Sequence, residues 1–191
     1  MSRRAAGDRV AGDLILSESD RRARFEQLAV PLLDDAMHLA VWLAGSRADA
    51  EDIVQEAMLR AYKYLDRFSG SAFRPWLLAI VRNTAMTWLK RNRSGKVVFV
   101  PDFQEEREAD ATAPQVESPE NAMLQRDLAD EVNRAVTALP SEFREVIVLR
   151  ELHELSYKEI AAVIDVPIGT VMSRLSRARR LLMDALPEHA T

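Results

Sequence analysis

The chain has 191 residues, 48% of them hydrophobic and 29% charged, and its formal net charge is −4. This composition is that of an ordinary globular protein, and the length allows one large or two small domains. The absence of cysteine excludes disulfides, thiolate metal sites and a cysteine nucleophile, and it fits a reducing cytoplasm. No apolar run approaches the ~18 residues of a membrane span, so membrane insertion is not expected.

A helical domain is predicted for the first part of the chain, residues 21–95. Residues 1–20 are expected to be a disordered extension. An opening pair of helices is predicted around regularly spaced leucines, with a break or bend near Pro31. A further helix is predicted from about Ser46, and a long one from about Phe73 to Arg91.

The helix predicted after Ser46 carries two stripes at helical spacing. One is apolar and is expected to be buried: Val54, Met58, Ala61 and Leu65. The other sets a leucine among acids and an amide: Asp52, Gln55, Glu56 and Leu59. An exposed leucine in such a setting is typical of a surface that docks a partner. The alternative is a solvated surface in which Leu59 is partly buried.

The long helix also has two sides. Its inner side is apolar and includes Phe73 and Trp76, whereas Arg82, Asn83, Met86 and Lys90 share an outer side. An asparagine can hydrogen-bond a base edge, while arginine and lysine bind phosphates. The outer side therefore predicts contact with nucleic acid.

The charges are segregated along the sequence. Residues 82–96 hold five basic residues and no acid, and residues 167–183 hold four arginines and no acid. Between them, residues 102–120 hold seven acids and one base. Two basic segments on either side of an acidic tether can contact one polyanion at two places. Residues 96–117 contain prolines and lack a helical apolar stripe, so a flexible linker is predicted there.

Four helices are predicted for the last part of the chain, residues 118–187, and the last two of them form a helix-turn-helix. Ser156 and Glu159 have the spacing of a capping box, which starts the first helix of this motif. In the second helix a buried seam of Val171, Leu175, Ala178 and Leu182 is expected. The opposite side holds Ser173, Ser176, Arg177 and Arg180, flanked by Arg174 and Arg179. This pattern is typical of a DNA recognition helix, the alternative being a solvated basic face.

Three stretches in this order resemble the extracytoplasmic-function group of the bacterial sigma-70 family. They are DAEDIVQEAMLRAY at 49–62, SAFRPWLLAIVRNTAMTWLKR at 71–91, and LPSEFREVIVLRELHELSYKEIAAVIDVPIGTVMSRLSRAR at 139–179. The resemblance implies an all-α fold of two small helical domains joined by the acidic flexible linker. Sigma region 2 would occupy 21–95, and sigma region 4, with the helix-turn-helix, would occupy 118–187.

The resemblance also implies a function and its residues. A sigma factor directs core RNA polymerase to promoters and helps to open the DNA, here in a stress, envelope or environmental response under an anti-sigma factor. Docking on the polymerase, through the clamp of its largest subunit and its flap, would involve Asp49, Asp52, Gln55, Glu56 and Leu59. The −10 element would meet Phe68, Ser69, Arg82, Asn83 and Lys90. The −35 element would meet Thr170, Ser173, Arg174, Ser176, Arg177 and Arg180.

Some implied roles stay open. Phe73 and Trp76 can stack on bases or belong to the core, and their place on the apolar stripe favours the core. Met172 stands where relatives often carry a basic residue, so one DNA contact is expected to be absent or apolar. The carboxylates of the linker either take the place of RNA phosphates in the exit path of polymerase or form a plain tether.

No catalytic constellation competes with this interpretation. His38, His153 and His189 are far apart, and none has a partner at ligand spacing, so no enzyme activity, metal or cofactor is expected. The protein is expected to act in the cytoplasm. One alternative is an autonomous helix-turn-helix regulator that binds DNA without polymerase. The other is a sigma mimic that titrates an anti-sigma factor.

Overall fold

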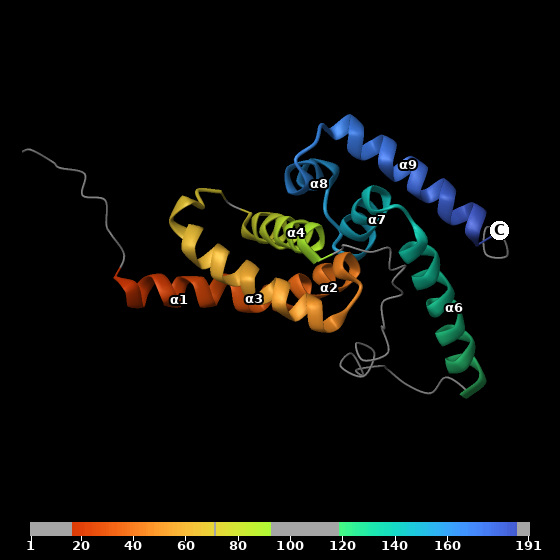
Figure 1. The fold of residues 1–191 in the computed structure, drawn as a ribbon, viewed down its shortest axis with the longest axis horizontal. Coiled ribbons are helices and arrows are strands. Elements are labelled where there is room, and N and C mark those ends of the chain that lie inside the picture. Colours follow the sequence, from red (N-terminus) through yellow and green to blue (C-terminus); the bar gives the residue numbers. More distant parts are fainter. Residues whose placement is uncertain (1–16, 71, 93–118, 187–191) are drawn as a thin grey trace, which may run out of the picture.

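The computed structural model describes residues 17–70, 72–92 and 119–186, and within these ranges every regular element is a helix, as predicted. Figure 1 shows α4 in the middle of the molecule, with α2 and α3 on one side and α8 on the other. The acidic linker predicted at 96–117 and most of the extension predicted at 1–20 lie outside the described residues.

The chain begins with helices α1 (Glu18–Ala29) and α2 (Leu33–Ala44), joined by the 3-10 turn η1 (Val30–Leu32). The side chain of Ser17 caps α1 by accepting a hydrogen bond from the backbone N–H of Asp20. The predicted domain boundary at residue 21 therefore lies inside α1. Pro31, which lacks an N–H, occupies the turn and accounts for the predicted break. Gly45 ends α2 with φ 80°, a left-handed conformation that favours glycine.

Helices α3 (Arg47–Tyr64) and α4 (Phe73–Asn92) complete the first bundle, with the 3-10 turn η2 (Leu65–Arg67) after α3. Ser46 caps α3 by accepting a hydrogen bond from the N–H of Asp49. The three helices α2, α3 and α4 contact one another along their apolar sides, and Leu39, Ile53 and Leu78 are almost fully buried between them. Burial of each such side chain contributes about 1.5–3 kcal/mol of transfer free energy.

The C-terminal helices are α6 (Pro119–Ala138), α7 (Ser141–Ile147), α8 (Tyr157–Ile164) and α9 (Ile168–Ala185). The predicted capping box is confirmed, because Ser156 and Glu159 bond reciprocally at the start of α8. Asp165 ends α8 in a left-handed conformation with φ 56°, and α9 starts after Pro167. A π-helical segment, η3 (Val148–Leu152), extends α7, and the sequence pattern did not predict it.

The two groups of helices pack directly on each other. Helix α4 contacts α8, while α2 contacts α7 and η3. One continuous apolar cluster includes Leu78 and Val81 of α4 together with Ile160 and Val163 of α8. This packing was not predicted, because the sequence suggested two domains coupled only through a tether.

Candidate DNA-binding and docking surfaces

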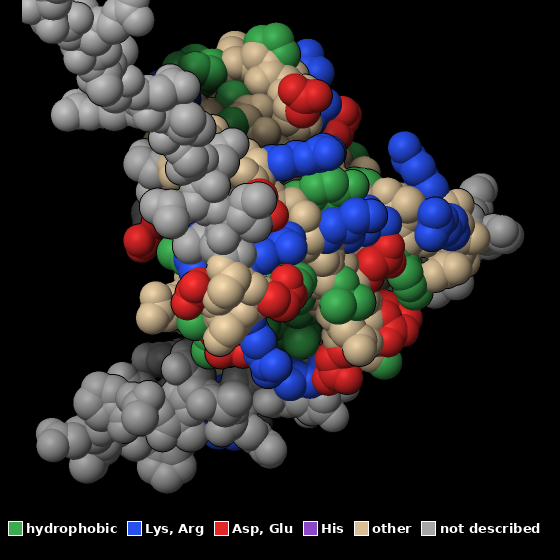
Figure 2. Space-filling view, turned by 90° about the vertical axis from the view of Figure 1, so that its left-hand side faces the viewer, with side chains coloured by type: hydrophobic (Ala, Val, Ile, Leu, Met, Phe, Trp, Pro, Cys, Tyr) green, Lys and Arg blue, Asp and Glu red, His purple; other side chains and the backbone are tan. Residues whose placement is uncertain are grey.

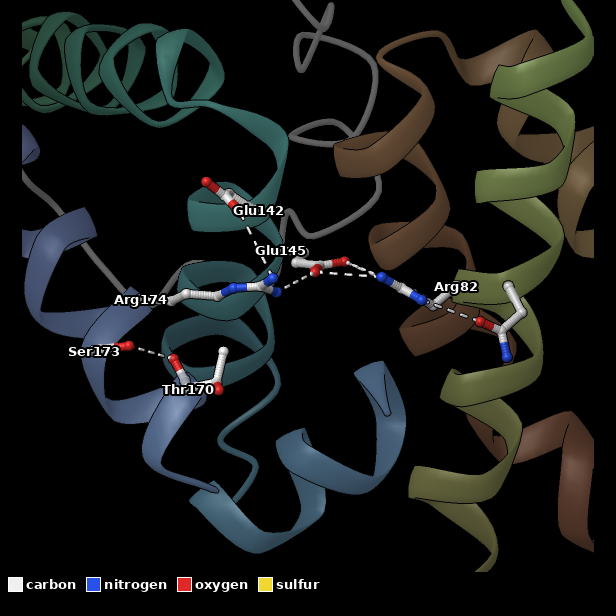
Figure 3. Close-up of polar contacts among 7 residues, drawn as sticks. Arg82, Glu142, Glu145, Thr170, Ser173 and Arg174 are labelled. Carbon is white, nitrogen blue, oxygen red and sulfur yellow. Dashed lines mark hydrogen bonds and ion pairs between the residues drawn. The ribbon is translucent and has the colours of Figure 1, made fainter. Parts of the chain in front are cut away.

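Helix α9 has the two sides that its sequence predicted. Val171, Leu175 and Ala178 are buried against the rest of the C-terminal helices, whereas Leu182, the fourth residue of the predicted seam, is half-buried. The outward side is exposed and small or basic, and it holds Ser173, Ser176, Arg177 and Arg180. Thr170 is half-buried, and its carbonyl accepts a hydrogen bond from Ser173 Oγ at 3.0 Å, drawn in Figure 3. Hydroxyls and guanidinium groups on one exposed side of a helix can meet phosphates and base edges in a major groove.

Arg174 lies apart from this exposed row, because its side chain turns toward α7. Its Nη1 is 3.2 Å from Glu145 Oε1, and its Nη2 is 3.6 Å from Glu142 Oε2. Figure 3 shows the guanidinium group pointing away from Ser173 and toward the two carboxylates. The residues predicted to meet the −35 element are therefore divided between the exposed side of α9 and an arginine held by its own domain.

The predicted DNA-contacting residues of α4 are also divided between exposed side chains and one held by the C-terminal helices. Asn83 and Lys90 are exposed, as a DNA-contacting side requires. Arg82 instead reaches across to the C-terminal helices, where its Nη2 lies 2.9 Å from Glu145 Oε2. Its Nη1 also donates a hydrogen bond to Asn83 Oδ1 at 3.2 Å. Met86, expected on the outer side, packs against the apolar cluster, because the C-terminal helices cover part of that side.

Glu145 is the charged residue common to both helices. It lies on α7 with only 3% of its surface exposed. Burial raises the pKa of its carboxyl above the ordinary range, and the guanidinium groups of Arg82 and Arg174 act in the opposite direction. The pattern of the sequence did not single out this residue, because a glutamate on a short helix is normally solvated.

Three aromatic rings form a cluster where α4 begins. Phe68, Phe73 and Trp76 contact one another with ring centroids 5.2–5.3 Å apart. Phe73 is buried, as its place on the apolar stripe predicted, whereas Phe68 and Trp76 are half-buried. Ser69, next to the cluster, is exposed. The cluster can therefore support the loop before α4 while leaving part of the Phe68 ring accessible.

The second stripe of α3 faces solvent. Leu59 is 67% exposed, which contradicts its expected partial burial in the alternative, while docking of a partner on this surface stays a prediction. Asp52 and Gln55 beside it are also exposed. Glu56 is half-buried and forms an ion pair with Arg60 one turn along the helix, and Asp49 is half-buried at the first turn. An exposed apolar side chain with carboxylates and an amide beside it suits a protein partner better than a nucleic acid.

His153, to which the sequence assigned no role, lies between the two groups of helices. It is 1% exposed, and its Nδ1 is 3.7 Å from Oδ1 of Asp35 on α2. Burial lowers its pKa from 6.5 to about 4, although the nearby Asp35 carboxylate acts in the opposite direction. Arg74 of α4 binds both partners, donating to Asp35 Oδ2 at 2.6 Å and to the His153 carbonyl at 2.7 Å.

Positive charge forms no unbroken surface on the face drawn in Figure 2, where Lys and Arg side chains alternate with Asp and Glu. Within the described ranges, no group of three His, Asp or Glu side chains could hold a metal ion. His189 lies outside these ranges. None of the helices in the described part of the chain is long and apolar enough to span a membrane.

Comparisons with known proteins identify the family of the chain. Residues 28–95 match the family described as sigma-70 region 2, and residues 129–182 match sigma-70, region 4. The chain is 43% identical over 139 residues to the ECF RNA polymerase sigma-E factor of Escherichia coli (strain K12), an alignment that covers 70% of this chain and 72% of the relative. It is 36% identical over 174 residues to the RNA polymerase sigma-H factor of Pseudomonas aeruginosa, covering 90% of each chain.

Two solved structures are also similar to this chain. The sigma factor RpoE from Bartonella quintana, in complex with the anti-sigma factor NepR, superposes with a TM-score of 0.63 and 26% identity over 86% of this chain and 97% of RpoE. CnrH in complex with the cytosolic domain of CnrY gives a TM-score of 0.62 and 25% identity, covering 90% of this chain and 92% of the other. The chain belongs to the extracytoplasmic-function group of the sigma-70 family, and it is an RNA polymerase sigma factor. This family acts in transcription initiation and is not a family of enzymes.

Proposed function

We propose that this sigma factor uses three separate helix surfaces to bring core RNA polymerase to a promoter. The outward stripe of α3, with Asp52, Gln55 and Leu59, docks on the clamp of the largest subunit. The exposed side of α4, with Asn83 and Lys90, holds the −10 element. The exposed side of α9, with Ser173, Ser176, Arg177 and Arg180, reads the duplex −35 element.

The observation that carries this proposal is the chemical difference between the three surfaces. The α3 stripe offers a leucine, two carboxylates and an amide, whereas α4 and α9 offer cations together with an amide or hydroxyls. A carboxylate repels phosphate, so the α3 stripe is unsuited to DNA, while amides and guanidinium groups bind base edges and phosphates. The three surfaces therefore suit one protein partner and two DNA segments.

Further assignments belong to the same proposal. The region 2 domain occupies 21–95 and the region 4 domain 118–187, with α1 extending the first to residue 18. The flap of polymerase is a second contact of the chain. The solved structure of RpoE from Bartonella quintana described above holds the anti-sigma factor NepR, which supports control of this chain by an anti-sigma factor as well. Its place of action is the cytoplasm, where bacterial transcription occurs, and it catalyses no reaction itself.

Run-off transcription tests the proposal. Purified chain and core polymerase are mixed with genomic fragments, and core polymerase alone is the control. Discrete transcripts that require the chain are expected. A chain that protects a DNA site by itself and adds no transcript is an autonomous regulator. A chain that binds neither core polymerase nor DNA, yet binds an anti-sigma factor, is a sigma mimic. Either of these results contradicts the proposal.

A further inference from the structure

Helix α9 exposes a large apolar side chain beside the residues proposed to meet DNA. Met172 is 52% exposed, although methionine is a residue type that is often fully buried. It lies next to Ser173 and one helical turn before Ser176, and both serines are exposed. Ile168, one turn before Met172, is 42% exposed. The proposed −35 surface therefore has an apolar part beside its hydroxyls and arginines.

The packing of the C-terminal helices does not account for this side chain. Val171 and Leu175 form the buried seam of α9, and each is almost fully removed from solvent. At the start of the same helix, a Cβ atom placed on Gly169 would have no atom of another part of the described chain within 4 Å. The apolar surface of Met172 therefore stays in water until a partner covers it, which is unfavourable for the free chain.

The position and the charge around Met172 favour duplex DNA as that partner. Met172 lies near the start of α9, which begins at Ile168. In a helix-turn-helix, the N-terminal residues of the second helix contact base edges in the major groove. Residues 167–183 hold four arginines and no acid, and this charge complements the phosphate backbones that border the groove. We therefore expect Met172 to meet a base edge.

The chemistry of a thioether limits which base edge it can favour. A methionine side chain donates no hydrogen bond and is only a weak acceptor. Against the donors and acceptors of guanine, cytosine or adenine, it would displace water and leave those groups without a partner. Thymine presents a methyl group in the major groove, and contact with it removes apolar surface of both partners from water. The flexible methionine side chain can also adapt to the position of that methyl group.

We propose that Met172 selects thymine at one position of the −35 element through apolar contact with the 5-methyl group of the base. This inference rests on the proposed function, in which α9 reads the −35 duplex. It adds to that function a base preference and the residue that determines it. Met172 therefore makes an apolar DNA contact rather than none.

The test compares thymine with uracil, which pairs with adenine in the same way but lacks the 5-methyl group. Holoenzyme made from the full chain and core polymerase first selects binders from promoter duplexes randomised in the −35 element. A selected promoter is then remade with uracil in place of each −35 thymine, one position at a time on either strand, and the affinity of holoenzyme is measured by competition. At one position, uracil should weaken binding about threefold to fivefold, which is the effect of removing one buried methyl group.

Two variants connect the uracil effect to one side chain. Met172→Ala should fold as the wild-type chain does, because the side chain is exposed. In the selection it should lose the thymine preference, and it should bind the thymine and uracil promoters equally well at that position. Met183→Ala is the matched control, since Met183 is 61% exposed and lies about 16 Å further along α9, at a rise of about 1.5 Å per residue. This control should keep both the thymine preference and the loss of affinity with uracil.

If uracil weakens binding of the wild-type holoenzyme at no −35 thymine, the inference is overturned, and this result needs no variant. An equal loss of affinity with uracil in Met172→Ala overturns it as well. A Met172→Ala chain that binds core polymerase more weakly but keeps the thymine preference shows that a protein covers this side chain, which also contradicts the inference. If the wild-type holoenzyme selects no −35 sequence at all, the proposed function itself fails. Selection with an unchanged thymine preference in Met172→Ala refutes only the role of Met172.

Discussion

His153, which follows η3, and Asp35 of α2 face each other across the boundary between the two helical domains, with Nδ1 and Oδ1 3.7 Å apart. Neither ring nitrogen of His153 has a hydrogen-bond partner within the described part of the chain. Arg74, and His38 further along α2, are the other charged or titratable groups that influence the imidazole. The neutral ring is therefore the form that the packed chain stabilises.

The first prediction concerns acidification. The pKa of His153 falls from 6.5 to about 4 on folding, so the unfolded chain binds the proton more tightly between these values. Stability is therefore expected to be full above pH 6.5 and to drop by about 3 kcal/mol as the pH falls toward 4. Urea unfolding across this range measures the effect. His153→Leu should flatten the slope of stability against pH, whereas His38→Leu, at an exposed histidine whose charge is a smaller influence on the imidazole than burial, should leave most of that slope. If His153→Leu shows the same slope of stability against pH as the wild-type chain, His153 is not the cause of that slope.

The second prediction concerns Arg74. Burial raises the pKa of Asp35, but the hydrogen bond and charge of Arg74 outweigh this effect and leave the pKa of Asp35 below its ordinary value. Arg74→Ala should destabilise the chain by about 1–3 kcal/mol and separate the unfolding of the two domains into two transitions, because it leaves Asp35 and the His153 carbonyl without their donor. Calorimetry detects both changes. Arg22→Ala, at an exposed pair with Glu26, is the control and should have little effect. A single unshifted transition in Arg74→Ala contradicts the role given to Arg74.

The sequence predicted the elements that depend on local chemistry. The Ser156–Glu159 capping box, the Pro31 break and the buried seam of α9 are all present, because caps, proline and helical periodicity act over a few residues. The exposed side of α3 follows from the same periodicity. The predicted binding residues themselves stay a prediction, since the structure shows only where they lie.

The contacts between the domains could not be predicted in this way. Glu145 and Arg82 are 63 positions apart, and Arg74 and His153 are 79 apart. No periodicity in a single sequence indicates that such residues meet. His153 looked like an isolated histidine, and its burial depends on which face of the first domain covers it. The π-helical segment at Val148–Leu152 was likewise not apparent from an apolar run alone.

The third prediction concerns the capping box. Ser156 Oγ accepts from the Glu159 N–H, and the Glu159 carboxylate accepts from the Ser156 N–H. Ser156→Ala should destabilise the helix-turn-helix by about 0.5–2 kcal/mol, because the Glu159 N–H at the start of α8 loses its acceptor. Ser176→Ala, the same change on the exposed side of α9, should have almost no effect on stability. Thermal unfolding of the two variants measures the difference, and equal melting temperatures would contradict the account of the cap.

The fourth prediction separates docking from folding. Asp52→Arg combined with Gln55→Ala should weaken binding to core polymerase while the chain melts as wild type, because both side chains are exposed and outside the buried stripe. Affinity for labelled core polymerase and thermal unfolding are measured in parallel. The control is Asp184→Arg, a charge reversal at an exposed residue of α9 that lies outside the docking surface. Unchanged affinity in the double variant shows that the α3 stripe is not the docking surface.

The most direct test of the central claim, that α4 and α9 read separate promoter elements, is transcription from promoters randomised at each element. Arg177→Ala should cost about 1–3 kcal/mol if the arginine reads a base, and it should relax preference only in the −35 element. Asn83→Ala should alter preference only in the −10 element. Arg179→Ala, at an arginine paired with Glu151, is the control on the same helix and should leave both preferences intact. A change of −35 preference in Asn83→Ala, or a change confined to the −10 element in Arg177→Ala, would contradict the account.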